Sequence, residues 1–280
     1  MDTVLRWLVY GLLAYGAFVL IVYFIQASLI FFPTHSLRAT PADIGLAYTD
    51  VILSTPDGVT LHGWWVPTTD PQGTVLFFHG NAGNVADRVE YLTIWHDLGW
   101  NVLILDYRGY GKSTGRPDEA GLYRDAETAW RYLTRERAIP DTSIVILGRS
   151  LGGAVAAYLA ARVRPRALIL DSAFTSLPAL AQQLYPWLPA RWLVRFRFPT
   201  VTYLQQVRCP VLIIHSVDDE IVPFRHAETL WRVAPEPKQL LRLRGGHNTA
   251  VWVSESAYRT GLAAFLQRLP KPPSFSRRSI

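Results

Sequence analysis

The sequence predicts an α/β fold, in which helices cover both faces of a mostly parallel sheet of eight strands with an antiparallel start. Short apolar, β-branched runs alternate with helix-favouring stretches between residues 51 and 269, the pattern of repeated strand–helix units. The runs are apolar throughout, as expected for strands that are buried on both faces. A separate apolar segment comes before this region and predicts an N-terminal transmembrane helix.

Residues 1–32 are expected to form this membrane anchor. Residues 7–25 contain no charged or strongly polar side chain, and about 20 helical residues cross a bilayer core of roughly 30 Å. A cleaved signal peptide is the alternative, but it expects a small-x-small cleavage site, and the sequence has no good one. The flanking charges are too few to fix the orientation. For a bacterial chain we expect a single-pass membrane protein with its globular part outside the cytoplasm.

Residues 33–269 are expected to form the globular domain, which begins with a β-hairpin. Pro56-Asp57-Gly58 separates two apolar runs, and Asp-Gly in that position is a strong hairpin signal. Strands alternate with helices after the hairpin. The expected strands are 51–54, 59–66, 74–78, 101–105, 144–147, 167–170, 211–214 and 239–243. The expected helices are 85–98, 119–137, 151–162, 225–233 and 249–269.

The connection over residues 172–208 is unusually long for a single loop and rich in Leu and aromatic residues. We expect a short helical cap that shapes an apolar acyl pocket, with Trp187 and Leu188 as substrate-binding residues. Three arginines in the cap fit either a solvated helix face or contact with anionic headgroups or a charged substrate group. They are Arg191, Arg195 and Arg197.

Composition excludes some classes of partner. The 280 residues carry a net charge of +6, half of it from Lys271, Arg277 and Arg278 in the segment 270–280, which is rich in Pro, Ser and Arg and predicted to be disordered. The chain lacks the dense Lys/Arg stripe of nucleic-acid-binding proteins, so no nucleic-acid partner is expected. The single cysteine, Cys209, excludes an internal disulfide and is expected to be buried.

The segment around Ser150 carries the clearest chemical signal. An apolar strand runs into Gly-x-Ser-x-Gly, and a helix-favouring stretch follows at once. This arrangement places a serine on a strained strand-to-helix turn, with its hydroxyl presented above the sheet. We expect Ser150 to be a nucleophile and the backbone N–H of Leu151, at the start of the helix, to stabilise an oxyanion.

A serine nucleophile needs a base, and the base needs a carboxylate that fixes its tautomer. Both are expected later in the chain, in the order Ser, acid, His, each after a strand. His247 follows strand 239–243 and a glycine pair, and it is the expected base. Asp219 is the expected acid, because of its spacing to Val222-Pro223. Asp218 and Asp171 are the alternatives.

The remaining histidines after Ser150, His215 and His226, are expected to be structural. A second oxyanion donor is expected from the backbone N–H of Asn81, because His79-Gly80-Asn81 follows strand 74–78. We expect His79 to pack within that loop.

Two other patterns do not support a cofactor. Gly109-Tyr110-Gly111-Lys112-Ser113 resembles a phosphate-binding loop, but the Walker pattern needs Gly where the chain has Asp106. The dinucleotide fingerprint needs Gly where the chain has Thr114. No metal-binding motif of His and Cys occurs, so neither a cofactor nor a metal is predicted.

Five motifs between residues 79 and 248 resemble the α/β-hydrolase superfamily, and the resemblance spans roughly residues 52–266. Among its families, the chain is most similar to membrane-anchored α/β-hydrolase-domain proteins, which include serine aminopeptidase-like and depalmitoylase-like members. The resemblance implies a Ser-His-Asp acyl-enzyme mechanism. One departure is Ser216, where many relatives have Gly. The motifs are His79-Gly80-Asn81-Ala82-Gly83-Asn84, Asp106-Tyr107-Arg108-Gly109-Tyr110-Gly111-Lys112-Ser113, Gly148-Arg149-Ser150-Leu151-Gly152-Gly153, Asp219-Glu220-Ile221-Val222-Pro223 and Gly245-Gly246-His247-Asn248.

These features predict a serine hydrolase of the carboxylesterase or thioesterase type. Its expected substrate is an ester or thioester with a lipid-like acyl chain, because the apolar cap and the anchor would place the site near lipid. An amide or peptide hydrolase of the aminopeptidase type is the second reading. A non-catalytic, membrane-tethered scaffold with the same fold is the third, since a fold alone does not establish an activity.

Overall fold

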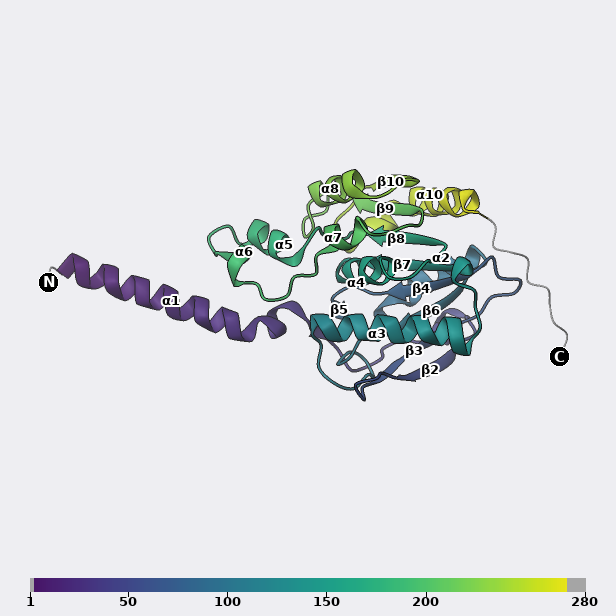
Figure 1. The fold of residues 1–280 in the computed structure, drawn as a ribbon, viewed down its shortest axis with the longest axis horizontal. Coiled ribbons are helices and arrows are strands. Elements are labelled where there is room, and N and C mark those ends of the chain that lie inside the picture. The colour runs from purple at the N-terminus through teal and green to yellow at the C-terminus, as the bar shows by residue number, and fades with distance from the viewer. Residues whose placement is uncertain (1–2, 271–280) are drawn as a thin grey trace.

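The computed structural model describes residues 3–270, and its centre is an eight-stranded sheet in the order β10-β9-β8-β7-β4-β6-β3-β2 (Figure 1). Strands β4 and β6 to β10 are parallel, whereas β3 runs antiparallel to both β2 and β6. The predicted mostly parallel sheet with an antiparallel start is therefore confirmed. The strands are β2 (Thr49–Ser54), β3 (Thr60–Val66), β4 (Thr74–Phe78), β6 (Asn101–Leu105), β7 (Ile144–Arg149), β8 (Ala167–Asp171), β9 (Val211–Ser216) and β10 (Lys238–Leu243).

Helices cover both faces of the sheet because its central strands are apolar on both sides. Side chains of β7 alternate between two cores: Ile144 and Ile146 face one, Val145 and Leu147 the other. Helices α3, α4 and α8 contribute to the first core, and α2, α9 and α10 to the second. Their bounds are α2 (Val89–Asp97), α3 (Glu119–Arg131), α4 (Leu151–Ala160), α8 (Arg225–Val233), α9 (Ala250–Val253) and α10 (Glu255–Arg268).

Several of the expected helices are shorter or divided. The helix expected over 119–137 is α-helical to Arg131 and continues as a π-helical turn (Tyr132–Glu136), and the one expected over 151–162 ends at Ala160. A 3-10 turn, η2 (Val85–Arg88), comes before α2, because the Asn84 side chain caps that turn by accepting a hydrogen bond from the Ala86 N–H. The helix expected over 249–269 is split at Ser254, whose hydroxyl bonds both the N–H and the carbonyl of Arg244. These bonds tie Ser254 to the chain after β10, and its backbone, with φ −114° and ψ 31°, lies outside the helical range.

A small second sheet was not expected from the sequence. Strand β1 (Phe32–Pro33) pairs in parallel with β5 (Ala82–Gly83), so the chain leaving the N-terminal helix lies against the loop after β4. The strands are only two residues long, too short for an apolar alternation to reveal them.

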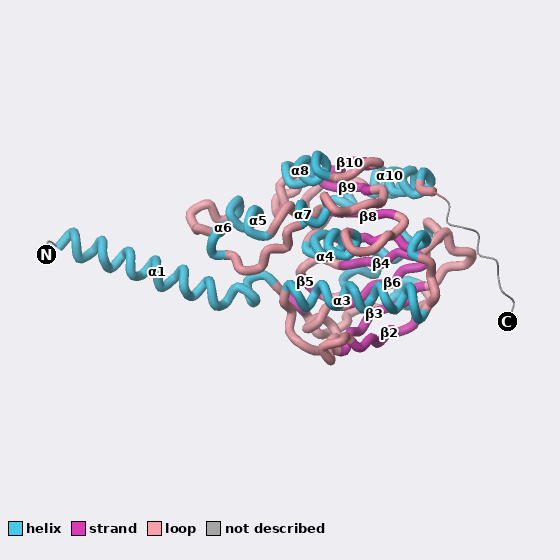
Figure 2. Tube along the Cα trace, viewed as in Figure 1, coloured by secondary structure: helices cyan, strands magenta, loops and turns pink. Residues whose placement is uncertain are grey.

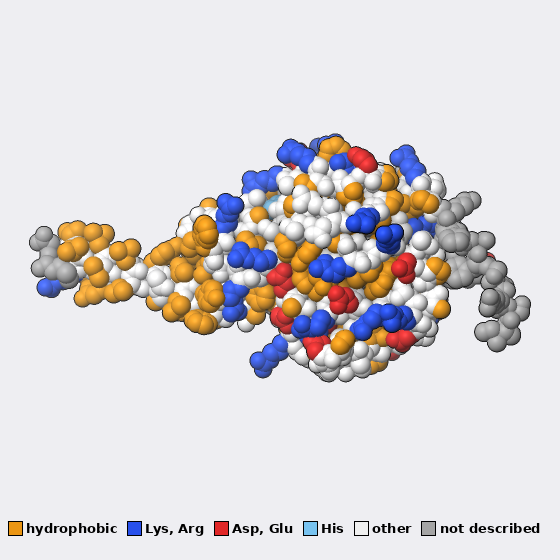
Figure 3. Space-filling view, in the orientation of Figure 1, with side chains coloured by type: hydrophobic (Ala, Val, Ile, Leu, Met, Phe, Trp, Pro, Cys, Tyr) orange, Lys and Arg blue, Asp and Glu red, His pale blue; other side chains and the backbone are white. Residues whose placement is uncertain are grey.

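Helix α1 (Thr3–Ile30) extends away from the sheet (Figure 1). It has a mean hydropathy of 2.3 over its most apolar stretch, and it is long and apolar enough to cross a bilayer. Apolar side chains predominate on its visible surface, and Arg6 is its one charged residue, whereas Lys and Arg are scattered over the body (Figure 3). Gln26 is its one buried residue.

Residues 172–208 form three short helices joined by loops at the end of the sheet nearest α1 (Figure 2). These are α5 (Leu177–Leu184), α6 (Ala190–Leu193) and α7 (Thr200–Leu204). We call residues 172–208 the cap. The Glu119 carboxylate at the start of α3 accepts hydrogen bonds from the N–H groups of Arg197 and Phe198, which fixes the cap to the body. The predicted disordered tail lies, except for Pro270, outside the described residues.

His226 ties α8 to the cap. Its Nδ1 accepts a hydrogen bond from the Thr175 N–H at 3.1 Å, and its Nε2–H donates to the Gln183 side chain at 2.9 Å. This pattern requires the neutral ring. Burial, with repulsion from His215 and Arg225, lowers the pKa of His226 to about 4.

The His226 contacts predict a stability that falls on acidification. The unfolded chain binds a proton near pH 6.5 and the folded protein only near pH 4, so unfolding takes up protons between these values and stability rises with pH there. The free energy of unfolding should fall by at most about 3 kcal/mol from pH 6.5 to pH 4. Urea unfolding at several pH values measures it. His226→Gln should remove this part of the slope, and an unchanged slope would contradict the assignment.

Candidate active site

Ser150 occupies a strained turn between β7 and α4. Its backbone has φ 52° and ψ −115°, outside the regions that non-glycine residues favour. The turn requires flanking glycines, because a Cβ at Gly148 would collide with the Gly152 carbonyl, and one at Gly152 with the Phe78 carbonyl. Leu151 is the first residue of α4, so no earlier helical carbonyl receives its N–H.

The structure brings Ser150, His247 and Asp219 together at the carboxyl ends of the strands. The Ser150 hydroxyl lies 3.2 Å from Nε2 of His247, and Nδ1 of His247 lies 2.7 Å from Oδ2 of Asp219. The residues lie far apart in sequence but follow β7, β10 and β9 respectively. With Nδ1–H donating to the carboxylate, Nε2 is free to accept the serine proton.

Asp219 is held as an anion. Its Oδ1 accepts hydrogen bonds from the N–H groups of Ile221 and Val222, at 3.0 and 2.7 Å. Burial alone would raise its pKa, but the side chains of His215 and His247 and the Val222 N–H outweigh that effect and hold the pKa of Asp219 well below its usual range.

The alternative carboxylates lie elsewhere. Asp218 is exposed and pairs with Arg244 at 3.1 Å. Asp171 is buried and accepts a hydrogen bond from the Ser172 hydroxyl at 3.0 Å, so the structure brings neither of them to the imidazole.

Three polar residues that sequence reasoning missed hold the His247 loop in place. Arg149, inside the Gly-x-Ser-x-Gly motif, is buried and donates to the His247 carbonyl at 2.6 Å. The Glu220 carboxylate accepts from the His247 N–H at 3.0 Å. The Ser216 hydroxyl donates to the Gly245 carbonyl. Ser216, which stands where many relatives have Gly, thus joins the loop that carries Asp219 to the loop that carries His247.

The loop after β4 lies beside Ser150. A Cβ built on Gly80 would stand 3.6 Å from the Ser150 Cβ, so the backbone of this loop passes close to the serine. Two tyrosines support it: Tyr107 donates to the His79 carbonyl at 2.9 Å, and Tyr110 to the Asn81 carbonyl at 2.7 Å.

The motif that begins at Asp106 therefore holds the loop after β4 in place through hydrogen bonds. The Asp106 carboxylate also accepts from the Val85 N–H at 2.9 Å. His79 is fully buried and packs on Tyr107 with ring centroids 4.6 Å apart.

The segment after α1 is also part of this scaffold. Thr34 donates its N–H to the Gly83 carbonyl at 3.2 Å, next to the β1–β5 pair. The Asn84 side chain donates to the carbonyls of Thr34 and Ser36, at 3.1 and 2.9 Å. The candidate oxyanion loop and the base of α1 are thus joined by hydrogen bonds.

The two residues expected to bind substrate lie in different surroundings. Leu188 is buried within the cap. Trp187 is 60% exposed, and its ring lies 5.9 Å from that of Phe18 on α1. The structure therefore places Trp187 against the N-terminal helix.

Cys209 is buried, as expected, and burial raises the pKa of its thiol to about 12.

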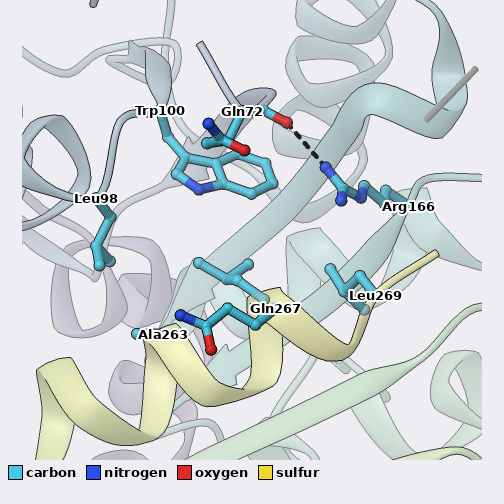
Figure 4. Close-up of a pocket in the computed structure, with 8 residues that line it drawn as sticks. Gln72, Leu98, Trp100, Arg166, Ala263, Gln267 and Leu269 are labelled. Atoms are coloured by element: carbon cyan, nitrogen blue, oxygen red, sulfur yellow. Dashed lines mark hydrogen bonds between the residues drawn. The ribbon is translucent and has the colours of Figure 1, made fainter. Parts of the chain in front are cut away.

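A separate cavity of about 370 Å³ lies at the other end of the sheet (Figure 4). Gln72, Trp100 and Arg166 come before β4, β6 and β8, and Arg166 donates to the Gln72 carbonyl at 2.9 Å. The cavity is therefore at the amino ends of the strands, opposite Ser150. Sites in open α/β sheets lie at the carboxyl ends.

An eight-stranded mixed sheet that presents a serine on a strand-to-helix turn defines the α/β-hydrolase class of folds. A family model described as the alpha/beta hydrolase fold matches residues 73–201. WAV2 of Arabidopsis thaliana, an alpha/beta hydrolase domain-containing protein, is 34% identical in an alignment that covers 92% of each chain. The uncharacterized protein Rv2307c of Mycobacterium tuberculosis is 40% identical over 226 residues, 80% of each chain. The chain belongs to the α/β-hydrolase superfamily.

Solved structures of esterases have the same fold. The Pyrococcus furiosus esterase Pf2001 superposes with a TM-score of 0.71 at 24% identity, covering 86% of this chain and 97% of that one. An acetyl xylan esterase from Paenibacillus sp. R4 superposes with a TM-score of 0.65 at 18% identity, covering 84% and 90%. At these identities the likeness shows the fold alone.

Arg149 is predicted to position the imidazole rather than to react. Arg149→Met removes a hydrogen bond from a charged donor, which contributes about 1.5–3 kcal/mol. For a reaction that uses His247 as its base, kcat should therefore fall about 10- to 100-fold with KM little changed. Steady-state kinetics measure this. Arg244→Met, at an exposed ion pair, is the matched control and should leave kcat unchanged. Equal effects of the two substitutions would contradict the role.

Proposed function

We propose that this protein is a serine hydrolase that cleaves an ester or thioester with a lipid-like acyl chain. The observation that carries the proposal is the line of hydrogen-bonding groups from the Ser150 hydroxyl through His247 to Asp219, at 3.2 and 2.7 Å. A hydroxyl, an imidazole and a carboxylate in this geometry form a general-base-activated nucleophile.

In the proposed reaction the Ser150 oxygen attacks the acyl carbonyl, and its proton passes to Nε2 of His247. The N–H groups of Leu151 and Asn81 stabilise the oxyanion, while Asp219 stabilises the imidazolium. The imidazolium then protonates the leaving alcohol or thiol, and an acyl-enzyme remains. Water, deprotonated by His247, attacks the acyl-enzyme and releases the carboxylic acid and Ser150.

The proposed preference for a lipid-like acyl chain rests on the surroundings of the site. The cap is apolar, and α1 is long and apolar enough to span a bilayer. We propose that α1 remains as a single-pass anchor, which groups the chain with the membrane-anchored members of the superfamily, including the depalmitoylase-like ones. Held at a membrane, the site would meet acyl chains that are presented by lipids or lipidated molecules.

An active-site-directed fluorophosphonate tests the nucleophile. The probe should label the wild-type protein at Ser150, and Ser150→Ala should abolish labelling and lower turnover by several orders of magnitude. Turnover is measured on p-nitrophenyl esters of graded chain length beside aminopeptidase substrates. Circular dichroism should show that the variant remains folded.

Failure of the folded wild-type protein to react with the probe or hydrolyse any ester would favour the scaffold reading. Cleavage of the aminopeptidase substrates alone would favour the amide reading.

A further inference from the structure

The cap and α1 form one continuous surface. Tyr15 on α1 donates to the Trp187 carbonyl at 3.2 Å, and Phe18 packs on the Trp187 ring. Nearer the body, Gln26 is buried: it donates to the Leu193 carbonyl and accepts from the Arg195 N–H, both at 2.8 Å. These contacts bond the cap to the side of α1, and the tube view shows the cap lying beside that helix (Figure 2).

The tip of the cap, residues 184–192, presents large apolar side chains to the outside. Trp192 is 87% exposed. The same short segment also exposes Leu184, Tyr185 and Trp187. Exposed apolar patches of this kind mark interaction surfaces, and Trp and Tyr are enriched where proteins meet the membrane interface.

The carbonyls in the middle of the tip are satisfied within the protein. Five consecutive carbonyls accept hydrogen bonds from within the protein: Tyr185 from the Leu188 N–H, Pro186 and Leu188 from the Gln182 side chain, Trp187 from Tyr15, and Pro189 from the N–H groups of Trp192 and Leu193. Pro186 and Pro189 have no N–H to satisfy. Each carbonyl that is bonded within the protein lowers the cost of placing this loop in lipid, where water cannot replace the missing partner.

The position of the contacts along α1 sets the depth of the tip. Phe18 lies 8 residues before Gln26, which corresponds to about 12 Å along a helix axis. If the uncharged span 7–25 lies in a bilayer, Phe18 lies well inside the hydrocarbon, and the Trp187 ring beside it lies at the same depth. Anchoring by α1 therefore brings the cap tip into the membrane as well.

The charge of the cap agrees with this placement. Residues 172–208 contain no Asp or Glu, and three of their four arginines, Arg191, Arg195 and Arg197, lie in the part of the cap near α1. The fourth, Arg208, precedes β9 at the opposite end of the sheet and plays no part here. The backbone of Arg195 is bonded to Gln26, and its guanidinium lies 5.1 Å from the Tyr23 ring centroid. Long basic side chains at such a level reach the headgroup phosphates while their stems stay in the apolar layer.

We propose that the tip of the cap is inserted into the phospholipid bilayer beside α1, so that the candidate active site takes its acyl substrate from the lipid phase. This inference rests on the proposed anchor and deepens the proposed function. The cap then acts as a second, short membrane element, and its apolar tip and the apolar surface of α1 share one lipid environment.

The experiment places a reporter on the tip in the full-length protein. Trp192→Cys carries an environment-sensitive nitrobenzoxadiazole dye, and the native Cys209 is buried. The matched control is Arg164→Cys, an exposed position before β8 at the opposite end of the sheet. Both proteins are reconstituted into vesicles of phosphatidylcholine and phosphatidylglycerol.

The dye at position 192 should be quenched by nitroxide-labelled phospholipid and should react several-fold more slowly with dithionite than the dye at 164. Alkaline carbonate extraction reports α1 insertion, and fluorophosphonate labelling of Ser150 reports the nucleophile in the same vesicles. Rapid dithionite reduction at 192 in protein that resists extraction and labels at Ser150 would overturn the inference alone. Release of the protein by carbonate would overturn the anchor and the inference together. Loss of labelling with a protected dye would contradict the proposed hydrolysis and support the insertion.

Discussion

The position of the His247 imidazole is the constraint on which the rest of the site depends. The ring must bond a hydroxyl on one side and a carboxylate on the other, so three loops from β7, β9 and β10 must meet within hydrogen-bond distance. Parallel strands supply this convergence, because their carboxyl ends lie at one edge of the sheet. Arg149 and Glu220 then fix the carbonyl and the N–H of His247, which leaves its backbone little freedom.

The N-terminal segment is bound into the same framework. Strand β1 pairs with β5 in the loop beside Ser150, and Gln26 joins α1 to the cap. Helix α1 is thus connected both to the loop after β4, which is the candidate oxyanion loop, and to the cap. The position of α1 is therefore connected through hydrogen bonds to the backbone beside Ser150.

Much of this could be predicted from the sequence, because strands buried on both faces and a serine between glycines leave local patterns. The order serine, acid, histidine likewise directed attention to Asp219 and His247. Long-range polar contacts leave no such pattern: Arg149 and the His247 carbonyl are 98 residues apart, and Gln26 and the Arg195 N–H are 169 apart. Trp187 could be recognised as an apolar cap residue, but its contact with Phe18 depends on where α1 lies.

Paired substitution of the two adjacent aspartates tests the central claim most directly, because Asp219 bonds His247 whereas Asp218 pairs with Arg244 on the surface. In ester hydrolysis, Asp219→Asn should lower kcat by about 10⁴-fold through loss of the correct imidazole tautomer. Asp218→Asn, measured alongside with unfolding curves for both proteins, should leave kcat close to that of the wild type. Equal losses in two folded variants, or a larger loss at Asp218, would contradict the account.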